Sequence, residues 1–143
     1  MSETIVLASD HAGVELKAAL KAVLAERGLE ALDLGAHDAA SVDYPDMADA
    51  LAAAVAEGRA ACGVLVCGTG IGISIAANRH RHLRAALCHD ITTARLARQH
   101  NDANVLVLGA RTIGIETARD CLAAFLDTTF AGGRHARRVG KLG

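Results

Sequence analysis

Short apolar runs alternate with amphipathic stretches from one end of the chain to the other. The apolar runs, such as CGVLVC at 62–67, lack polar alternation, which is typical of strands covered on both faces of a parallel sheet. In the stretches between them, apolar residues recur at helical spacing. We therefore predict strands at residues 4–8, 30–34, 62–67, 83–88 and 105–108, and helices at residues 12–27, 46–57, 71–79, 91–100 and 115–127.

Five successive β-α units predict one architecture. We expect an α/β domain of the doubly wound, Rossmann-like type, with a five-stranded, mostly parallel sheet and helices on both faces. No repeat or linker interrupts the pattern, so a single domain should span residues 1–143 and end in a basic tail at 128–143. A chain of this length buries roughly two-thirds of its unfolded surface, so its core requires neither disulfides nor a structural metal.

Composition and charge disfavour several classes of function. The 15 Lys and Arg residues nearly balance the 16 Asp and Glu residues, and the chain has one Tyr, two Phe and no Trp. This argues against nucleic-acid partners and against a polybasic protein of membrane surfaces. Residues 60–78 carry no charge, but their glycines favour a strand, a turn and a helix start over a membrane span.

The expected location follows from the cysteines and from the first residues. The four cysteines form no CxxC pair, and residues 1–4 lack the basic and apolar regions of a signal peptide. We therefore expect reduced thiols and a cytoplasmic protein.

In a doubly wound sheet, ligands bind beyond the carboxyl ends of the strands, where the strand order reverses. Three segments are expected at this edge: Ser9-Asp10-His11, Cys67-Gly68-Thr69-Gly70-Ile71-Gly72 and Gly109-Ala110-Arg111. The second is the strongest signal, because its alternate glycines and the helix start behind them can direct several backbone N–H groups at an anion. The segment lacks the Walker lysine and the dinucleotide spacing, so a nucleotide is disfavoured; a strand-to-helix turn without a ligand is the simpler alternative.

Cys67 ends the third strand at this turn. Backbone N–H dipoles stabilise a thiolate, which makes Cys67 a candidate base or nucleophile. Asp10 adds a carboxylate at the same edge, unless it only caps the following helix, and His11 adds a ring N–H for an anionic group. Most free cysteines are small buried apolar residues, and we expect this role for the other three, Cys62, Cys88 and Cys121.

Three further polar groups have competing interpretations. Residues 98–102 (RQHND) are either functional or a solvated helix end. Arg134 and Arg138 share a face if the tail is helical, where two guanidinium groups suit a phosphate; a disordered basic tail is the alternative. The histidine-rich run 79–84 has no complete ligand set and its arginines repel cations, so we expect a solvated loop and no metal site.

These groups together favour one kind of chemistry. A base, a carboxylate, a histidine, an anion hole and arginines are present, whereas nothing resembles a hydride carrier or a nucleotide lysine. We therefore expect cofactor-free proton transfer on a small phosphorylated substrate.

Five motifs, in order, resemble the ribose-5-phosphate isomerase type B family, which includes galactose-6-phosphate and allose-6-phosphate isomerases. They are SDHAG at 9–13, DYP at 43–45, CGTGIGISIAAN at 67–78, RQHNDAN at 98–104 and GGRHARRV at 132–139. The resemblance covers nearly the whole chain. It implies an aldose–ketose isomerisation through a cis-enediolate without any cofactor, most specifically of D-ribose 5-phosphate to D-ribulose 5-phosphate in the non-oxidative pentose phosphate pathway.

The resemblance also implies catalytic roles. Cys67 would move the proton between C1 and C2 of the sugar, and the N–H groups of residues 68–72 would stabilise the enediolate, with Thr69 assisting. Asp10 and His100 would serve ring opening and proton transfer on the sugar oxygens. A second branch of the family takes its base from a glutamate at the position of Ile73, and Ile73 cannot accept a proton, which favours Cys67.

Binding roles follow in the same way. By resemblance, Tyr44 and Asn101 would contact the sugar. Family members are homodimers or dimers of dimers with active sites shared between subunits, so His100 and Asn101 would act across an interface. The phosphate would be held by His11, Arg134 and Arg138, with Arg111 as a further candidate.

Two alternatives to a ribose-5-phosphate isomerase stay open. One is the same chemistry on another aldose phosphate, namely erythrose 4-phosphate, allose 6-phosphate or galactose 6-phosphate. The other is a non-catalytic subunit that binds phosphosugars without turnover.

Overall fold

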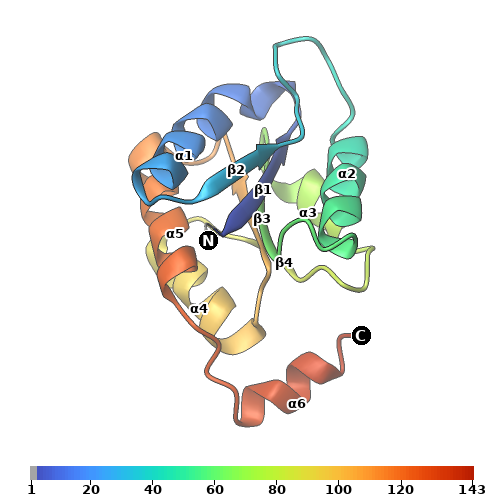
Figure 1. The fold of residues 1–143 in the computed structure, drawn as a ribbon, viewed down its shortest axis with the longest axis vertical. Coiled ribbons are helices and arrows are strands. Elements are labelled where there is room, and N and C mark those ends of the chain that lie inside the picture. Colours follow the sequence, from blue (N-terminus) through green and yellow to red (C-terminus); the bar gives the residue numbers. More distant parts are fainter. Residues whose placement is uncertain (1–2) are drawn as a thin grey trace.

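The structure, a computed structural model, describes residues 3–143, and within them the chain forms one five-stranded parallel sheet (Figure 1). Residues 1 and 2, which belong to the segment without signal-peptide features, lie outside the described residues. The strands have the order β2-β1-β3-β5-β4, and each pairs in parallel with its neighbours. Their bounds are Thr4–Ser9 (β1), Glu30–Asp33 (β2), Cys62–Cys67 (β3), Ala85–Leu87 (β4) and Val105–Gly109 (β5).

Helices cover both faces of the sheet, as the alternating pattern predicted. Helices α1, α4 and α5 form one layer and α2 and α3 the other, whereas α6 lies at the end of the molecule where the strands begin (Figure 1). The helix bounds are Val14–Glu26 (α1), Tyr44–Ala56 (α2), Ile71–Ala77 (α3), Ile91–Asn101 (α4), Ile115–Asp127 (α5) and Arg134–Gly140 (α6).

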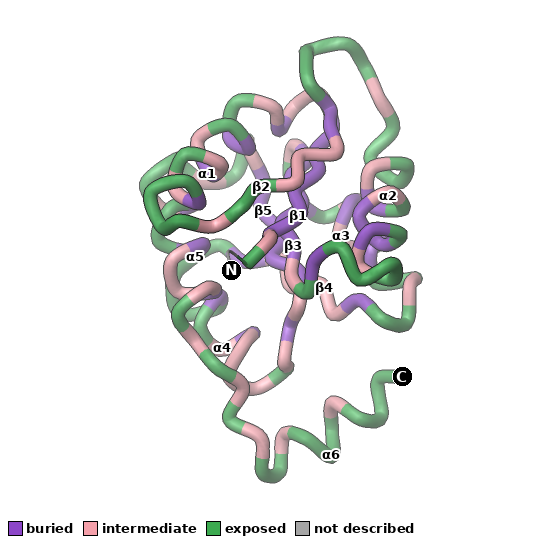
Figure 2. Tube along the Cα trace, in the orientation of Figure 1, coloured by how far each residue is buried: buried purple, intermediate pink, exposed green. Residues whose placement is uncertain are grey.

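The central strands are buried because each contributes side chains to two cores. In β3, Val64 and Val66 pack with the α1, α4 and α5 layer, whereas Leu65 and Cys67 pack with α2 and α3. Figure 2 shows this buried centre and the exposed outer faces of the helices. The alternation directs the Cys67 side chain toward the α2 and α3 layer, at the carboxyl end of its strand.

Several element boundaries differ from the prediction, and local hydrogen bonds explain two of them. The first helix begins at Val14 rather than at residue 12, because Asp10 caps a 3-10 turn at His11–Gly13. Helix α3 ends at Ala77 and β4 begins at Ala85, because the Asn78 side chain bonds both the N–H and the carbonyl of Ala85, each at 2.9 Å. A side-chain bond of this kind leaves no trace in the apolar pattern.

The basic tail is ordered in part. Helix α6 forms within it after Gly132 and Gly133, which have φ values of +68° and +57°. The disordered alternative is therefore wrong for this segment. The uncharged run 60–78 forms β3, a turn and α3, and within residues 3–143 we find no helix long and apolar enough to cross a membrane.

Candidate active site

The site is built where the strand order reverses, at the carboxyl ends of β1 and β3. Ser9 of β1 lies opposite Val66 of β3, and the Asp10 N–H donates to the Val66 carbonyl at 3.2 Å. Asp10 and Cys67 therefore leave neighbouring strands side by side, as the topology predicted.

Cys67 opens a tight turn that directs a backbone donor at its sulfur. Its Sγ accepts a hydrogen bond from the Gly70 N–H at 3.2 Å, and the residue is only 4% exposed. Gly70 has a φ of +78° and stands directly before α3, and the Ile71 N–H donates to Thr69 Oγ1 at 3.2 Å. The turn thus directs one backbone N–H, that of Gly70, at the sulfur, and a thiolate would be a stronger acceptor of this bond than a thiol.

The other three cysteines have the structural role that we expected. Burial raises the pKa of Cys88 and of Cys121 to about 11, and it also raises the pKa of Cys62. Cys88 and Cys121 lie in the core under α1, α4 and α5. All four cysteines are free thiols.

Asp10 and His11 are fixed by backbone donors. Asp10 is 8% exposed, and its side chain accepts from the Ala12 N–H at 3.0 Å, so it does cap the following turn. Its backbone N–H is also held by the Val66 carbonyl, so the position of Asp10 does not depend on the cap alone. His11 Nδ1 accepts from the Val42 N–H at 3.3 Å. An acceptor at Nδ1 places the proton of the neutral ring on Nε2, the nitrogen free to donate to an anion.

Tyr44 and Arg111 lie against the turn after β3, at the carboxyl edge of the sheet. The Tyr44 ring lies so close to Gly72 that a Cβ on this glycine would stand 2.6 Å from the ring carbon Cζ. The Arg111 N–H donates to the Gly68 carbonyl at 2.8 Å, and its guanidinium reaches back over Gly68. The structure therefore brings Cys67, the 68–72 turn, Asp10, His11, Tyr44 and Arg111 to one edge of the sheet.

Four predicted site residues lie elsewhere in this chain: His100, Asn101, Arg134 and Arg138. Helix α4 starts beyond the carboxyl end of β4 and runs back, so His100 and Asn101 stand at the amino edge of the sheet, as does α6 (Figure 1). A six-residue strand separates the two edges by about 20 Å. Within one chain these four residues cannot meet Cys67.

These residues nonetheless form a cluster of their own, which includes a residue that we did not predict. The imidazole rings of His100 and His135 stack with centroids 4.4 Å apart and planes 11° apart, which joins α6 to the end of α4. Desolvation and the charges of His100, Arg134 and Arg138 lower the pKa of His135. His135 lies inside the motif at 132–139, and its helical spacing of three residues from Arg138 could have marked it.

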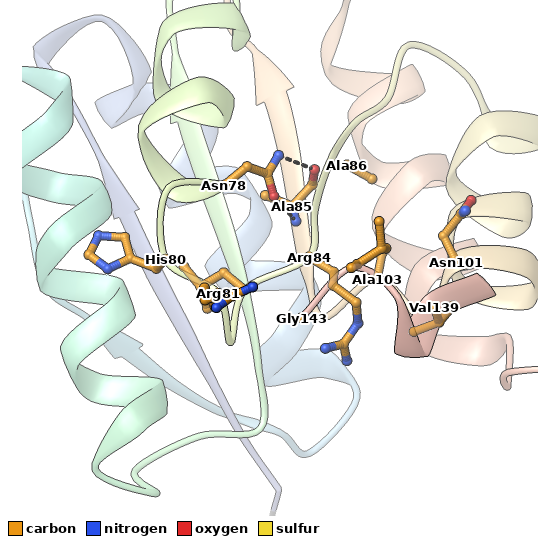
Figure 3. Close-up of a pocket in the computed structure, with 12 residues that line it drawn as sticks. Asn78, His80, Arg81, Arg84, Ala85, Ala86, Asn101, Ala103, Val139 and Gly143 are labelled. Carbon is orange, nitrogen blue, oxygen red and sulfur yellow. Dashed lines mark hydrogen bonds between the residues drawn. The ribbon is translucent and has the colours of Figure 1, made fainter. Parts of the chain in front are cut away.

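A cavity of about 570 Å³ opens at the same amino edge, between β4 and α6 (Figure 3). Arg81, Arg84 and Asn101 line it, together with Val139 of α6. Its place is remote from Cys67, so it is not where the base would act on a substrate.

The histidine-rich run 79–84 behaves as a connecting turn. His80 pairs with Asp49 at 2.8 Å, and His82 bonds the Ala52 carbonyl at 2.8 Å, so both rings are attached to α2. Across residues 3–143, no group of three or more His, Cys, Asp and Glu side chains could hold a metal ion.

Comparison with known proteins gives a consistent result. The model of the ribose/galactose isomerase family matches residues 5–142. The chain is 46% identical over 135 residues to ribose-5-phosphate isomerase B of Escherichia coli, covering 94% of this chain and 91% of that protein. It is 42% identical over 142 residues to D-erythrulose-4-phosphate isomerase of Pectobacterium atrosepticum, covering 98% and 93%. The solved ribose-5-phosphate isomerase B of Clostridium thermocellum is similar with a TM-score of 0.96 and 48% identity, covering 98% of this chain and 95% of that chain.

Proposed function

This chain belongs to the ribose/galactose isomerase family, and from that premise we propose that it interconverts D-ribose 5-phosphate and D-ribulose 5-phosphate. The observation that carries the proposal is that Cys67 ends the strand next to the one that leads into Asp10, and that its sulfur receives a backbone N–H. Relatives named as isomerases of this sugar phosphate, similar over nearly the whole chain, support the choice of substrate.

Isomerisation moves two protons and needs no external oxidant or reductant. In the open-chain aldose, the Cys67 thiolate takes the proton from C2, and the C2–H electron pair forms the C1=C2 double bond while O1 takes the negative charge. The Cys67 thiol then returns the proton to C1, as the O2 proton passes to O1 and C2 becomes the carbonyl. Asp10 would carry the proton between the two oxygens and would assist ring opening before the first step.

The turn after β3 supplies electrostatic stabilisation. The enediolate oxygen carries charge only while the reaction proceeds, so fixed N–H donors stabilise it more than they stabilise the substrate. The Gly70 N–H lies at the Cys67 sulfur and would serve the enediolate, whereas the Ile71 N–H already donates to Thr69 Oγ1. The phosphate would be held by His11 Nε2–H and Arg111, at the same edge.

A second copy of the chain would complete the site. We propose that it brings His100, Asn101, Arg134 and Arg138 from its amino edge to the carboxyl edge of the first copy. The second copy could bury apolar side chains that are exposed at the carboxyl edge. Ile71 and Ile75 of α3 are 53% and 55% exposed, and Tyr44 is 40% exposed. Because a C2 contact is reciprocal, a dimer of this kind would hold two shared sites.

The four free thiols suit a reducing compartment, and we therefore infer that this reaction takes place in the cytoplasm.

Initial rates on a panel of sugar phosphates test the proposal. The panel is ribose 5-phosphate, erythrose 4-phosphate, allose 6-phosphate and galactose 6-phosphate, each assayed with EDTA and without added metal. We expect kcat/KM for ribose 5-phosphate to exceed the others by at least about tenfold. A preference for erythrose 4-phosphate would agree with the name of the Pectobacterium relative. It would change the proposed substrate and leave the proposed isomerisation mechanism in place. Binding of phosphosugars without turnover of any of them would instead indicate a non-catalytic subunit.

A further inference from the structure

Helix α1 buries a lysine. Lys17 is 2% exposed and stands in the apolar face of α1 between Leu16 and Leu20. Lysines are almost never fully buried unless their charge is paired, because an ammonium group loses its hydration on leaving water. A buried lysine so close to the carboxyl edge of β1 requires a specific partner.

The Lys17 ammonium group bridges the last residue of β2 and the segment that follows this strand. Its Nζ lies 2.8 Å from Asp33 Oδ1 and donates to the carbonyl of Ala36. The same Oδ1 atom of Asp33 accepts from the Gly35 N–H at 2.9 Å, and Asp33 Oδ2 pairs with Lys21 Nζ at 3.1 Å. One buried charge therefore fixes the end of β2 and the first residue of the 36–43 segment, which we call the 36–43 loop.

That anchor point lies directly against the strand that leads into the site. The Ser9 N–H donates to the Gly35 carbonyl, and the Ala36 N–H donates to the Ser9 carbonyl, both at 2.7 Å. From Ala36 the 36–43 loop runs to Val42, whose N–H holds His11 Nδ1, and then to Tyr44 at the start of α2. The 36–43 loop thus supplies the hydrogen bond that orients His11, and it leads directly into Tyr44 and so determines where this residue lies.

We propose that Lys17 is a positioning residue for substrate binding: it anchors the 36–43 loop and, through it, sets His11 and Tyr44. The inference rests on the proposed function, in which these two side chains contact the phosphate and the sugar. Cys67 and Asp10 are held by other contacts, namely the Gly70 N–H, the Val66 carbonyl and the Ala12 N–H. Loss of the anchor should therefore impair binding and spare the chemical step.

The kinetic test compares Lys17→Met with Lys21→Met. Methionine keeps the unbranched shape of lysine and removes its charge, and Lys21 pairs with the same carboxylate from a side chain that is 41% exposed. We expect Lys17→Met to raise KM for ribose 5-phosphate at least about tenfold with kcat within about threefold of wild type, and Lys21→Met to leave both within about twofold. A merely structural role would lower kcat through loss of folded enzyme and leave KM unchanged.

A second measurement is independent of activity. Proteinase K should cleave the 36–43 loop at least about fivefold faster in Lys17→Met than in wild type or Lys21→Met, because a released loop opens locally. Asp33→Asn, which keeps an oxygen for Gly35 but removes the charge, should shift KM in the same direction if Lys17→Met does not fold. Unchanged KM and unchanged cleavage in the folded variants would overturn the proposal. If the wild-type chain turns over no sugar phosphate but the loop of Lys17→Met is still cleaved faster than that of wild type, the proposed function is refuted and the anchoring role of Lys17 stands.

Discussion

Cys67 and Cys88 show how the surroundings of a residue decide its chemistry. Cys88 donates from its thiol to the Ala86 carbonyl at 3.5 Å, and burial holds its proton on the sulfur. The Cys67 sulfur instead accepts a hydrogen bond from the Gly70 N–H at 3.2 Å. A sulfur that accepts from the backbone is suited to the anionic form, which is the form that acts as a base.

Asp33 should make the stability of the fold depend on pH. Burial alone would raise its pKa, but hydrogen bonds from Lys17, the Gly35 N–H and Lys21 outweigh it and hold the pKa below its ordinary value of 3.8. A carboxyl group with a lowered pKa contributes its full stabilisation above its unfolded pKa and loses it as the pH falls through the lowered pKa of the folded state. Asp33→Asn should therefore lower the free energy of unfolding more at neutral pH than near pH 3. Urea unfolding at both pH values measures this, and equal losses would contradict it.

Among the secondary-structure elements, the apolar pattern predicts the strands that are buried on both faces of the sheet and the helices that cover them. The five strands and their helices follow from it because their side chains fill the two cores. Helix α6 could not be found in this way, since none of its residues is buried. The end of α3 was equally hidden, because it is set by the side chain of Asn78 rather than by burial.

The part of the site that lies at the carboxyl edge of the sheet could be predicted from the order of the strands and helices. Parallel strands bring Asp10, Cys67 and Arg111 to one edge, so their grouping followed from the order of elements. The role of His100 came only from the resemblance, since the order of elements places the end of α4 at the opposite edge. The spacing of Arg134 and Arg138 predicted a phosphate site, and the resemblance alone connected that site with Cys67. Lys17 was missed because a lysine within a helical stripe normally extends to solvent.

The turn after β3 should tolerate no side chain at Gly70. A Cβ there would lie 2.5 Å from Leu87 Cδ1 and 3.0 Å from the carbonyl carbon of Leu108, and the φ of +78° adds strain. We expect Gly70→Ala to cost about 2–4 kcal/mol of unfolding free energy and at least about tenfold in kcat. Gly58→Ala is the matched control, because Gly58 has a φ of +77° but open space around it, and it should cost about 1 kcal/mol. Equal costs in urea unfolding would show that the turn is not closely packed.

At the scale of the whole molecule, the proposed site is divided between opposite ends of the sheet. Cys67 and Asp10 lie at the carboxyl edge, and His100 and Arg138 lie toward the amino edge (Figure 1). A sheet cannot bend to join its own two edges, so only a second chain can bring the two sets together. The stacked pair of His100 and His135 keeps the second set attached to the body of its own chain.

Mixing two inactive variants tests this division. Cys67→Ala and His100→Ala damage different halves, so a mixed dimer holds one site with both defects and one site with none. After unfolding and refolding of an equal mixture, we expect about a quarter of wild-type kcat, since about half of the dimers are mixed and each has one intact site. Each variant refolded alone is the control. No recovery in the mixture would place both residues in the same chain's site.

Cys67 is the proposed base of this sugar phosphate isomerase. The most direct test of this role is kcat at saturating ribose 5-phosphate for Cys67→Ala, beside Cys121→Ala, which removes a thiol from the core. We predict that Cys67→Ala loses at least about a hundredfold in kcat while substrate binding is retained, and that Cys121→Ala stays within about twofold of wild type. Near-normal turnover by Cys67→Ala would contradict the account.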